Sequence, residues 1–214
     1  MSEEWTQNDI PDLSGKVVVI TGANSGLGLA STRALAAKGA DIIMACRSVE
    51  RAEAARAEVV AEVPSAKLTV MQLDNASLES VRTFAEAFNA RHDRLDLLLN
   101  NAGVMAVPRR LTEDGFEMQF GVNHLAHFAL TGRLLGALTR TEGSRVHTTS
   151  SSAAFRASFN FDDLMGEDSY GRWEAYGQSK LANAAFATEL DRRLKAAGRS
   201  TIANSSHPGL VRTN

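Results

Sequence analysis

The chain has 214 residues, of which 44% are hydrophobic and 22% are charged, a composition typical of a globular domain. Its formal net charge of -2 argues against nucleic acid or an anionic membrane as a partner. The single cysteine, Cys46, excludes an internal disulfide framework and favours a reducing, cytoplasmic location. The acidic N-terminus does not resemble a secretory signal, and no stretch is long and apolar enough to predict a membrane span.

Short apolar runs alternate along the chain with longer segments of helical periodicity. We expect strands at residues 16–21, 40–46, 67–73, 95–101, 144–150 and 200–207. We expect helices at residues 27–38, 49–62, 78–91, 112–139 and 175–197. The first and fourth of these strands are apolar on both faces, as in a parallel sheet covered by helices on both sides. The alternation predicts one doubly wound α/β domain over residues 14–214, after an N-terminal extension over residues 1–13.

Three glycines lie between the first expected strand and the first expected helix, in TGANSGLG at residues 21–28. Such a turn lets the backbone approach a pyrophosphate closely, and the helix N-terminus adds unpaired N–H groups. The alternative is a tight turn whose glycines adopt positive φ with nothing bound. The strand–turn–helix context favours a dinucleotide site, although the spacing of Gly22, Gly26 and Gly28 differs from the common G-x-G-x-x-G fingerprint.

Three further motifs follow in order: NNAG at residues 100–103, YGQSK at residues 176–180 and HPGLVRT at residues 207–213. Together with the glycine turn, from about Leu13 onward, they resemble the short-chain dehydrogenase/reductase family. The resemblance implies a Rossmann fold and a nicotinamide cofactor. Relatives continue for some tens of residues past the position of Thr213, through a substrate lid, so a C-terminal part is expected to be missing here.

Longer segments indicate a branch of the family. GLGLASTRAL, IIMACRSVERAE and DGFEMQFGVNHLAHF resemble the retinol-dehydrogenase and WW-domain-oxidoreductase branch, and nearly as much the light-dependent protochlorophyllide reductases. The latter carry a cysteine shortly after the motif lysine and a long insertion before the motif tyrosine. This chain has Leu181 and Ala182 there, and only 24 residues separate Ser151 from Tyr176, so the pigment reductase is disfavoured.

Tyr176 and Lys180 form a chemically coherent pair. Reducing a carbonyl needs a hydride donor and a proton donor near the carbonyl oxygen. A free tyrosine ionises only near pH 10, and a nearby cation favours its phenolate. Residues four apart share one helix face, so Lys180 can supply that cation. The alternative is a solvated helical pair, with the tyrosine on a rim and the lysine in water.

Two more catalytic residues are implied by the resemblance. A serine after the fifth strand would hold the substrate oxygen; Ser151 is our choice among the three serines at residues 150–152, with Ser150 second. A helix asparagine, here Asn123, would hold a water that links the lysine to solvent. The alternatives are turn and cap chemistry for the serines and a backbone-bonded amide for the asparagine.

The end of the second strand bears on the choice of cofactor. Cys46 stands where a carboxylate would accept from the 2′-hydroxyl of NAD, and Arg47 follows it, which predicts NADP(H) in preference to NAD(H), with Ser48 as a helper. Against this, Ser25 occupies a position that is basic in some NADP-preferring relatives. Asp74 would lie near the adenine, or cap the helix that begins near Leu78. The expected cofactor-binding residues are Gly22, Asn24, Ser25, Gly26, Leu27, Gly28, Arg47, Ser48, Asp74, Asn101, Ala102, Gly103, Tyr176, Lys180, Pro208, Gly209 and Thr213.

No metal site is expected, because His124 and His127 stand three apart on a helix without a suitably spaced third ligand. The sequence as a whole predicts an NADP(H)-dependent enzyme that interconverts an apolar carbonyl and its alcohol. Relatives commonly pair through the helices expected at residues 112–139 and 175–197, which implies a homodimer or homotetramer. The alternative is a non-catalytic, NADP-binding regulator with the same fold.

Overall fold

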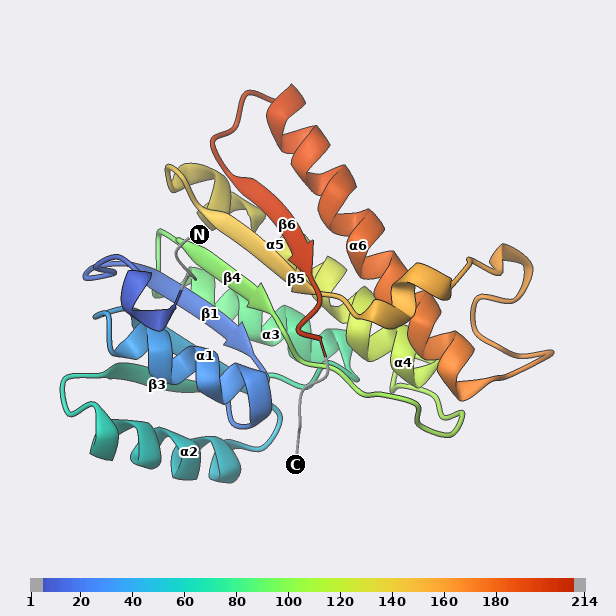
Figure 1. Ribbon diagram of the computed structural model, residues 1–214, viewed down its shortest axis with the longest axis horizontal. Helices are drawn as coiled ribbons and strands as arrows, with labels where there is room; N and C mark the ends of the chain where they lie inside the picture. Colours follow the sequence, from blue (N-terminus) through green and yellow to red (C-terminus); the bar gives the residue numbers. More distant parts are fainter. Residues whose placement is uncertain (1–5, 210–214) are drawn as a thin grey trace, which may run out of the picture.

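The computed structural model describes residues 6–209, which form a single six-stranded parallel sheet with helices on both faces (Figure 1). The strands are β1 (Val17–Thr21), β2 (Asp41–Cys46), β3 (Lys67–Gln72), β4 (Leu97–Asn100), β5 (Arg145–Thr149) and β6 (Ile202–Ser206). Their order is β3-β2-β1-β4-β5-β6, so the direction of winding reverses between β1 and β4. In parallel sheets of this kind, ligands bind beyond the carboxyl ends of the strands at that reversal.

The principal helices are α1 (Gly26–Ala36), α2 (Val49–Glu62), α3 (Leu78–Asn89), α4 (Met118–Phe120), α5 (Ala126–Arg140) and α6 (Arg172–Ala196). A π-helical segment, η2 (Gly121–Leu125), joins α4 directly to α5. The 3-10 segments are η1 (Gln7–Asp9), η3 (Ser152–Arg156) and η4 (Phe161–Asp163). Among the described residues, no helix combines the length and the apolar character needed to cross a membrane.

Alternate side chains of β1 point to opposite faces of the sheet, and each set enters a different apolar core. Val17 and Val19 pack into the core that includes Phe84, Phe88 and residues of α5. Val18 and Ile20 pack into the second core, among buried side chains of β2 and α2. Burial on both faces explains why the first strand is apolar throughout, and it confirms the expected doubly wound fold.

The helix expected at residues 112–139 begins later than predicted, at Met118. Residues 112–117 form a turn in which Gly115 has φ +84° and the Thr112 N–H donates to the carbonyl of Phe116 at 2.8 Å. The Glu117 carboxylate then caps the helix, because it accepts the N–H groups of Gln119 at 2.9 Å and Phe120 at 2.7 Å. The last expected helix, at residues 175–197, begins earlier than predicted, at Arg172.

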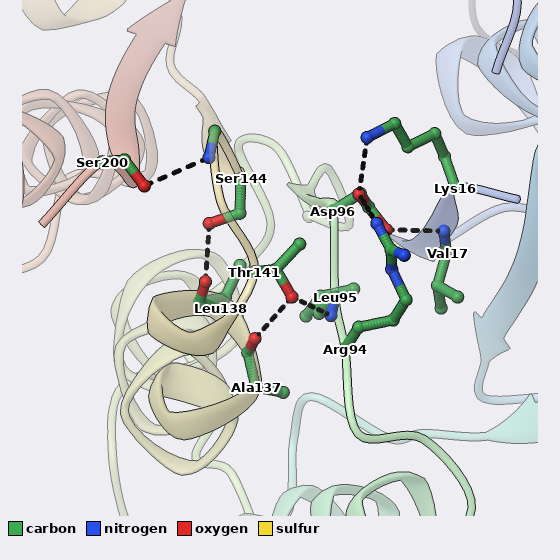
Figure 2. Close-up of polar contacts among 11 residues, drawn as sticks. Lys16, Val17, Arg94, Leu95, Asp96, Ala137, Leu138, Thr141, Ser144 and Ser200 are labelled. Atoms are coloured by element: carbon green, nitrogen blue, oxygen red, sulfur yellow. Dashed lines mark hydrogen bonds and ion pairs between the residues drawn. The ribbon is translucent and has the colours of Figure 1, made fainter.

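The amino ends of β1 and β4 are fastened together by Asp96 (Figure 2). Its carboxylate accepts the Val17 N–H at 3.0 Å and pairs with Lys16 at 3.1 Å and Arg94 at 2.7 Å. Next to it, Thr141 after α5 accepts the Leu95 N–H at 3.1 Å. These contacts set the register in which Val19 lies opposite Leu98, and so they align the two carboxyl ends.

Candidate active site

The glycine turn after β1 packs tightly against the loop that follows β4. Gly22 has φ +67°, and a Cβ there would lie 3.2 Å from the Ala102 Cα. A Cβ on Gly28 would collide with the carbonyl oxygen of Gly22 and lie 2.8 Å from the Asn101 Nδ2. Gly26 has φ +50°, in the left-handed region that favours glycine. All three glycines are therefore required by the backbone path and its packing.

The NNAG loop is held by the last residue of β1. Thr21 Oγ1 accepts the N–H groups of Asn101 and Ala102, both at 2.9 Å. In return, the Asn101 amide donates to the Thr21 carbonyl at 2.9 Å. The loop and the glycine turn thus form one backbone surface at the carboxyl edge of the sheet.

The structure brings Tyr176 and Lys180 together on one buried face of α6. Both side chains are almost fully buried, and the Lys180 Nζ lies 5.8 Å from the centre of the Tyr176 ring. The ammonium donates to the Thr149 carbonyl at 3.0 Å. Burial lowers the pKa of Lys180 to about 8. The lysine is therefore a cation beside the tyrosine at neutral pH and not a solvated surface charge.

The serines after β5 differ in what their hydroxyl groups contact. The Ser150 Oγ is buried and donates to the carbonyl of Lys180 at 2.8 Å, so its hydrogen is committed to α6. Ser151 precedes η3, and its Oγ accepts the Ala153 N–H at 3.2 Å. That acceptor role leaves the Ser151 hydrogen for another partner. Ser152 is exposed.

The Asn123 side chain, in the π-helical segment, is buried and bonded to protein. Its Oδ1 accepts the Val104 N–H at 2.8 Å, and its Nδ2 donates to the Val104 carbonyl at 3.0 Å and to the Ser179 Oγ at 2.9 Å. The amide therefore joins the loop after β4 to α6. Its bonds to the Val104 backbone match the alternative of a backbone-bonded amide. A Cβ on Gly103 would lie 3.0 Å from the Asn123 Oδ1 and 3.5 Å from the Lys180 Nζ, so this glycine permits the close approach.

The residues expected near the adenine end of a cofactor follow β2 and β3, at the same edge of the sheet. Arg47 is exposed, and the Ser48 side chain caps α2 by accepting the Arg51 N–H at 3.3 Å. Asp74 is half-buried and accepts the Ala76 N–H at 2.9 Å. The cap of α3 is Ser77, so the alternative reading of Asp74 as that cap is wrong.

The glycine turn is also fixed to the end of β2. The Gly22 N–H donates to the carbonyl of Ala45 in β2 at 2.9 Å, and burial raises the pKa of the neighbouring Cys46 thiol to about 11. Ser25 is the N-cap residue of α1 but makes no side-chain capping hydrogen bond. A thiol of this kind is a small buried group and not a nucleophile.

A cavity of about 180 Å³ opens where the glycine turn, β4, β5 and the segment after β6 meet. It is lined by Leu27, Ser31, Leu99, Asn101, His147, Thr149, Ser206 and Pro208. Three of these, Leu27, Asn101 and Pro208, were expected from the sequence. Gly209 follows the last of them with φ +73°, whereas Thr213 lies outside the described residues.

Sequence reasoning missed the other five lining residues of this cavity, which are Ser31, Leu99, His147, Thr149 and Ser206. The His147 Nδ1 lies 2.7 Å from the Asn204 Oδ1, and its Nε2 lies 3.3 Å from the Ser206 Oγ. A usable signal was present in the sequence of β5, RVHTT, where the buried positions alternate with more exposed polar ones. That alternation distinguishes β5 from the uniformly buried β1.

The two helix histidines are packed against protein. His124 Nδ1 contacts the Asn183 Oδ1 at 3.2 Å, and His127 is fully buried. Within residues 6–209, no group of three or more histidine, cysteine, aspartate or glutamate side chains is arranged to hold a metal ion.

The sheet order and the glycine turn after β1 define a Rossmann-fold protein. The model of the family described as short chain dehydrogenase matches residues 16–214, and the chain belongs to this family. The predicted resemblance to its retinol-dehydrogenase branch is confirmed by the relatives that follow.

The chain is 47% identical to retinol dehydrogenase 14 of Homo sapiens over 215 residues, which cover 94% of this chain and 63% of that protein. It is 46% identical to retinol dehydrogenase 13 of Homo sapiens, covering 94% of this chain and 60% of that one. The chain thus spans about three-fifths of the length of these curated relatives. A crystal structure of an uncharacterized protein from Mycobacterium paratuberculosis superposes with a TM-score of 0.86 at 48% identity, covering 96% of this chain and 72% of that one.

Proposed function

We propose that the chain is an NADP(H)-dependent oxidoreductase that interconverts an aldehyde or ketone with the corresponding alcohol. The observation that carries the proposal is the burial of Lys180 beside Tyr176, at the sheet edge that also carries the glycine turn. Burying an ammonium group costs solvation free energy. Here the buried ammonium lies beside a tyrosine hydroxyl, the kind of group that a carbonyl reduction needs as proton donor.

The residues present fit a dinucleotide. The left-handed glycines Gly22 and Gly26 leave two positions without a side chain in the turn in front of α1, whose N-terminus favours a pyrophosphate. A cavity of about 180 Å³ adjoins the turn and includes Leu27, Asn101 and Pro208 in its lining, whereas Tyr176, Lys180 and Ser151 do not line it. When bound, the reduced nicotinamide supplies a hydride to the carbonyl carbon.

The chain's own residues handle the proton and the oxygen. Tyr176 gives its hydroxyl proton to the carbonyl oxygen as the hydride arrives, and the Lys180 ammonium stabilises the phenolate left behind. Ser151 donates a hydrogen bond to the same oxygen, a role supported by its uncommitted hydrogen, whereas Ser150 is engaged with α6. Asn123 positions the loop after β4 against α6. In the proposed mechanism it also holds a water that links Lys180 to solvent.

The preference for NADP(H) rests on Arg47. It is exposed directly after β2, where its guanidinium can reach a 2′-phosphate, and the preceding residue is the buried Cys46 rather than a carboxylate. Asp74 lies at the adjacent strand end, at the adenine side of the site. The cytoplasmic location and the homodimer or homotetramer stay predictions.

An apolar substrate is supported by an exposed aromatic side chain beside Tyr176 and by two more on the 3-10 segments that precede α6. Trp173 is 57% exposed, and its ring meets the Tyr176 ring edge-on with the centroids 6.2 Å apart. Phe155 in η3 and Phe161 in η4 are 77% and 76% exposed. The names of the curated relatives point to the same class of substrate, an apolar alcohol or aldehyde of the retinoid kind.

The first test is a calorimetric titration of the chain with NADPH and, separately, with NADH. Binding with a preference for NADPH is expected, followed by oxidation of NADPH when a long-chain apolar aldehyde is added. Tyr176→Phe should bind NADPH as the parent does and lose turnover. Binding without turnover in the parent would favour the non-catalytic regulator, and no binding of either cofactor would overturn the proposal.

A further inference from the structure

His127 is a buried imidazole that contacts segments on which the candidate site is built. The proposed chemistry does not use it. It lies in α5 with 1% of its surface exposed. Its Nδ1 lies 3.0 Å from the carbonyl oxygen of Asn123. Its Nε2 lies 2.9 Å from the Thr21 Oγ1 and 3.0 Å from the Asn75 Nδ2. Both ring nitrogens are therefore engaged, each with a different part of the chain.

The surrounding groups assign the proton on this ring. A carbonyl oxygen can only accept, so the Nδ1 facing Asn123 must carry hydrogen. The Asn75 Nδ2 also faces the carbonyl of Val122 at 3.3 Å, which fixes it as the donor end of the amide, and Nε2 must then accept. The Thr21 Oγ1 already accepts two N–H groups, so it can only donate to Nε2. Its hydrogen has two acceptors in reach, the Nε2 at 2.9 Å and the Leu99 carbonyl at 3.4 Å, and the shorter contact is the one to the ring. The network fits a neutral ring protonated at Nδ1.

The two sides of the ring lead to the two halves of the candidate site. Through Nε2, the ring meets Thr21, whose hydroxyl holds the backbone of Asn101 and Ala102. Through Nδ1, it holds the carbonyl of Asn123, whose side chain in turn binds Val104 and α6. The imidazole is a rigid link between the cofactor-facing loop and the helix segment beside the catalytic lysine.

We infer that His127 is a positioning residue which, as the Nδ1–H tautomer, couples the NNAG loop to the Asn123 segment and so fixes the cofactor relative to the catalytic residues. The inference rests on the proposed function for its kinetic consequences, but the tautomer and the two links are properties of the fold. Neutrality of the ring is supported by burial, which lowers the pKa of His127 to about 4 and outweighs the hydrogen bond to the Asn123 carbonyl, which raises it; the charges of Lys180 and His124 lower it further.

The tautomer is tested on the parent protein, labelled with ¹⁵N in its histidines. Long-range ¹H–¹⁵N correlation spectra at neutral pH report which ring nitrogen carries the proton. A neutral ring protonated at Nδ1 is expected for His127, assigned by its loss in His127→Leu or, if that variant does not fold, in His127→Gln. A proton on Nε2, or a doubly protonated ring, would overturn the inference.

The two links are tested by variants that each keep one of them. In His127→Asn, the side-chain amide can still donate to the Asn123 carbonyl but is too short for Thr21; in His127→Gln, the side-chain oxygen can still accept from Thr21. We expect His127→Asn to weaken NADPH binding about tenfold with a smaller loss of kcat. His127→Gln should instead keep the Kd for NADPH and lower kcat about tenfold, because small misplacements at a reacting centre cost rate steeply.

His92→Gln is the matched control, because the His92 ring stacks on Phe88 with the centroids 4.8 Å apart and belongs to neither of the two linked segments. Equal losses in Kd and kcat for both His127 variants, or the same losses in His92→Gln, would show a general structural role and refute the inference. If the parent binds NADPH but turns over no apolar carbonyl, the proposed function fails. The tautomer and the Kd difference between the two variants then still decide the inference.

Discussion

Replacing Asp96 by alanine should destabilise the fold and leave the candidate site intact. This side chain is 8% exposed and accepts four hydrogen bonds, from the Val17 N–H, from Lys16 and, through two nitrogens, from Arg94. Its removal leaves the buried Val17 N–H without this acceptor, which costs about 1–3 kcal/mol. Lys16 and Arg94 are 44% and 50% exposed and regain water, so each lost pair adds only about 0–1 kcal/mol.

The expected decrease in the free energy of unfolding is therefore about 2–4 kcal/mol for Asp96→Ala. Asp96→Asn, which keeps an oxygen for the Val17 N–H, should lose about half as much. Urea unfolding followed by circular dichroism measures both, and the exposed neighbour Asp93 provides the control variant Asp93→Asn. A loss below about 0.5 kcal/mol for Asp96→Ala, or one no larger than that of the control, would refute the assignment of a buried, shared acceptor.

The pH dependence of stability should follow from the same carboxylate. Burial alone would raise the pKa of Asp96, but the hydrogen bonds from Arg94, the Val17 amide and Lys16 outweigh it and hold the pKa below 3.8. A lowered folded-state pKa means that the stabilisation is complete above the ordinary value and is lost as the pH falls through the folded-state value. Asp96→Asn should show a shallower loss of stability in that acid range than the parent.

Four further outcomes are expected. Arg47→Asp should shift the ratio of NADPH to NADH affinity toward NADH, and an unchanged ratio would place the phosphate elsewhere. Ser151→Ala should lower kcat by about 10²-fold or more while Ser150→Ala acts mainly on stability, a division that equal kcat losses would contradict. Carbonyl reduction should decline above pH 8, where Lys180, with a pKa of about 8, loses its charge; a rate that is flat to pH 10 would exclude this assignment. The pKa of His127 is lowered from 6.5 to about 4, so the free energy of unfolding should fall by about 3 kcal/mol as the pH falls from 6.5 to 4. This pH-dependent loss should be absent from a His127→Leu variant.

The strands could be predicted from the sequence because a parallel sheet buried on both faces demands continuous apolar runs, and residues 17–21 and 97–100 carry them. The glycine turn could be predicted for a similar reason, since glycine adopts the positive φ of Gly22 and Gly26 at the least steric cost. Helical spacing places Tyr176 and Lys180 on one face, but it does not show that this face is buried.

Features that depend on distant partners could not be predicted. Ser150 and Ser151 are adjacent and chemically identical, and only the carbonyl of Lys180, thirty residues away, separates their roles. The start of the helix after Leu111 was placed too early because TED resembles a helix N-terminus, whereas Gly115 and the Glu117 cap delay it to Met118. The partners of the His127 Nε2 come from the ends of two strands, Thr21 in β1 and Asn75 after β3, which the sequence does not show together.

The π-helical segment at residues 121–125 changes the direction in which side chains point between the start of this helix and α5. An α-helix turns by about 100° per residue. A π-helical turn, with hydrogen bonds between residues five apart, inserts one extra residue into the helix. Downstream of it, Leu130 and Leu134 face the sheet; within it, Asn123 faces the loop after β4. Deleting one residue from this turn would rotate the upstream segment relative to a fixed α5 and carry Asn123 away from Val104. The packing face of α5 and the orientation of Asn123 are therefore set by different parts of one helix. Core residues of α5 can be substituted without changing the direction in which Asn123 points.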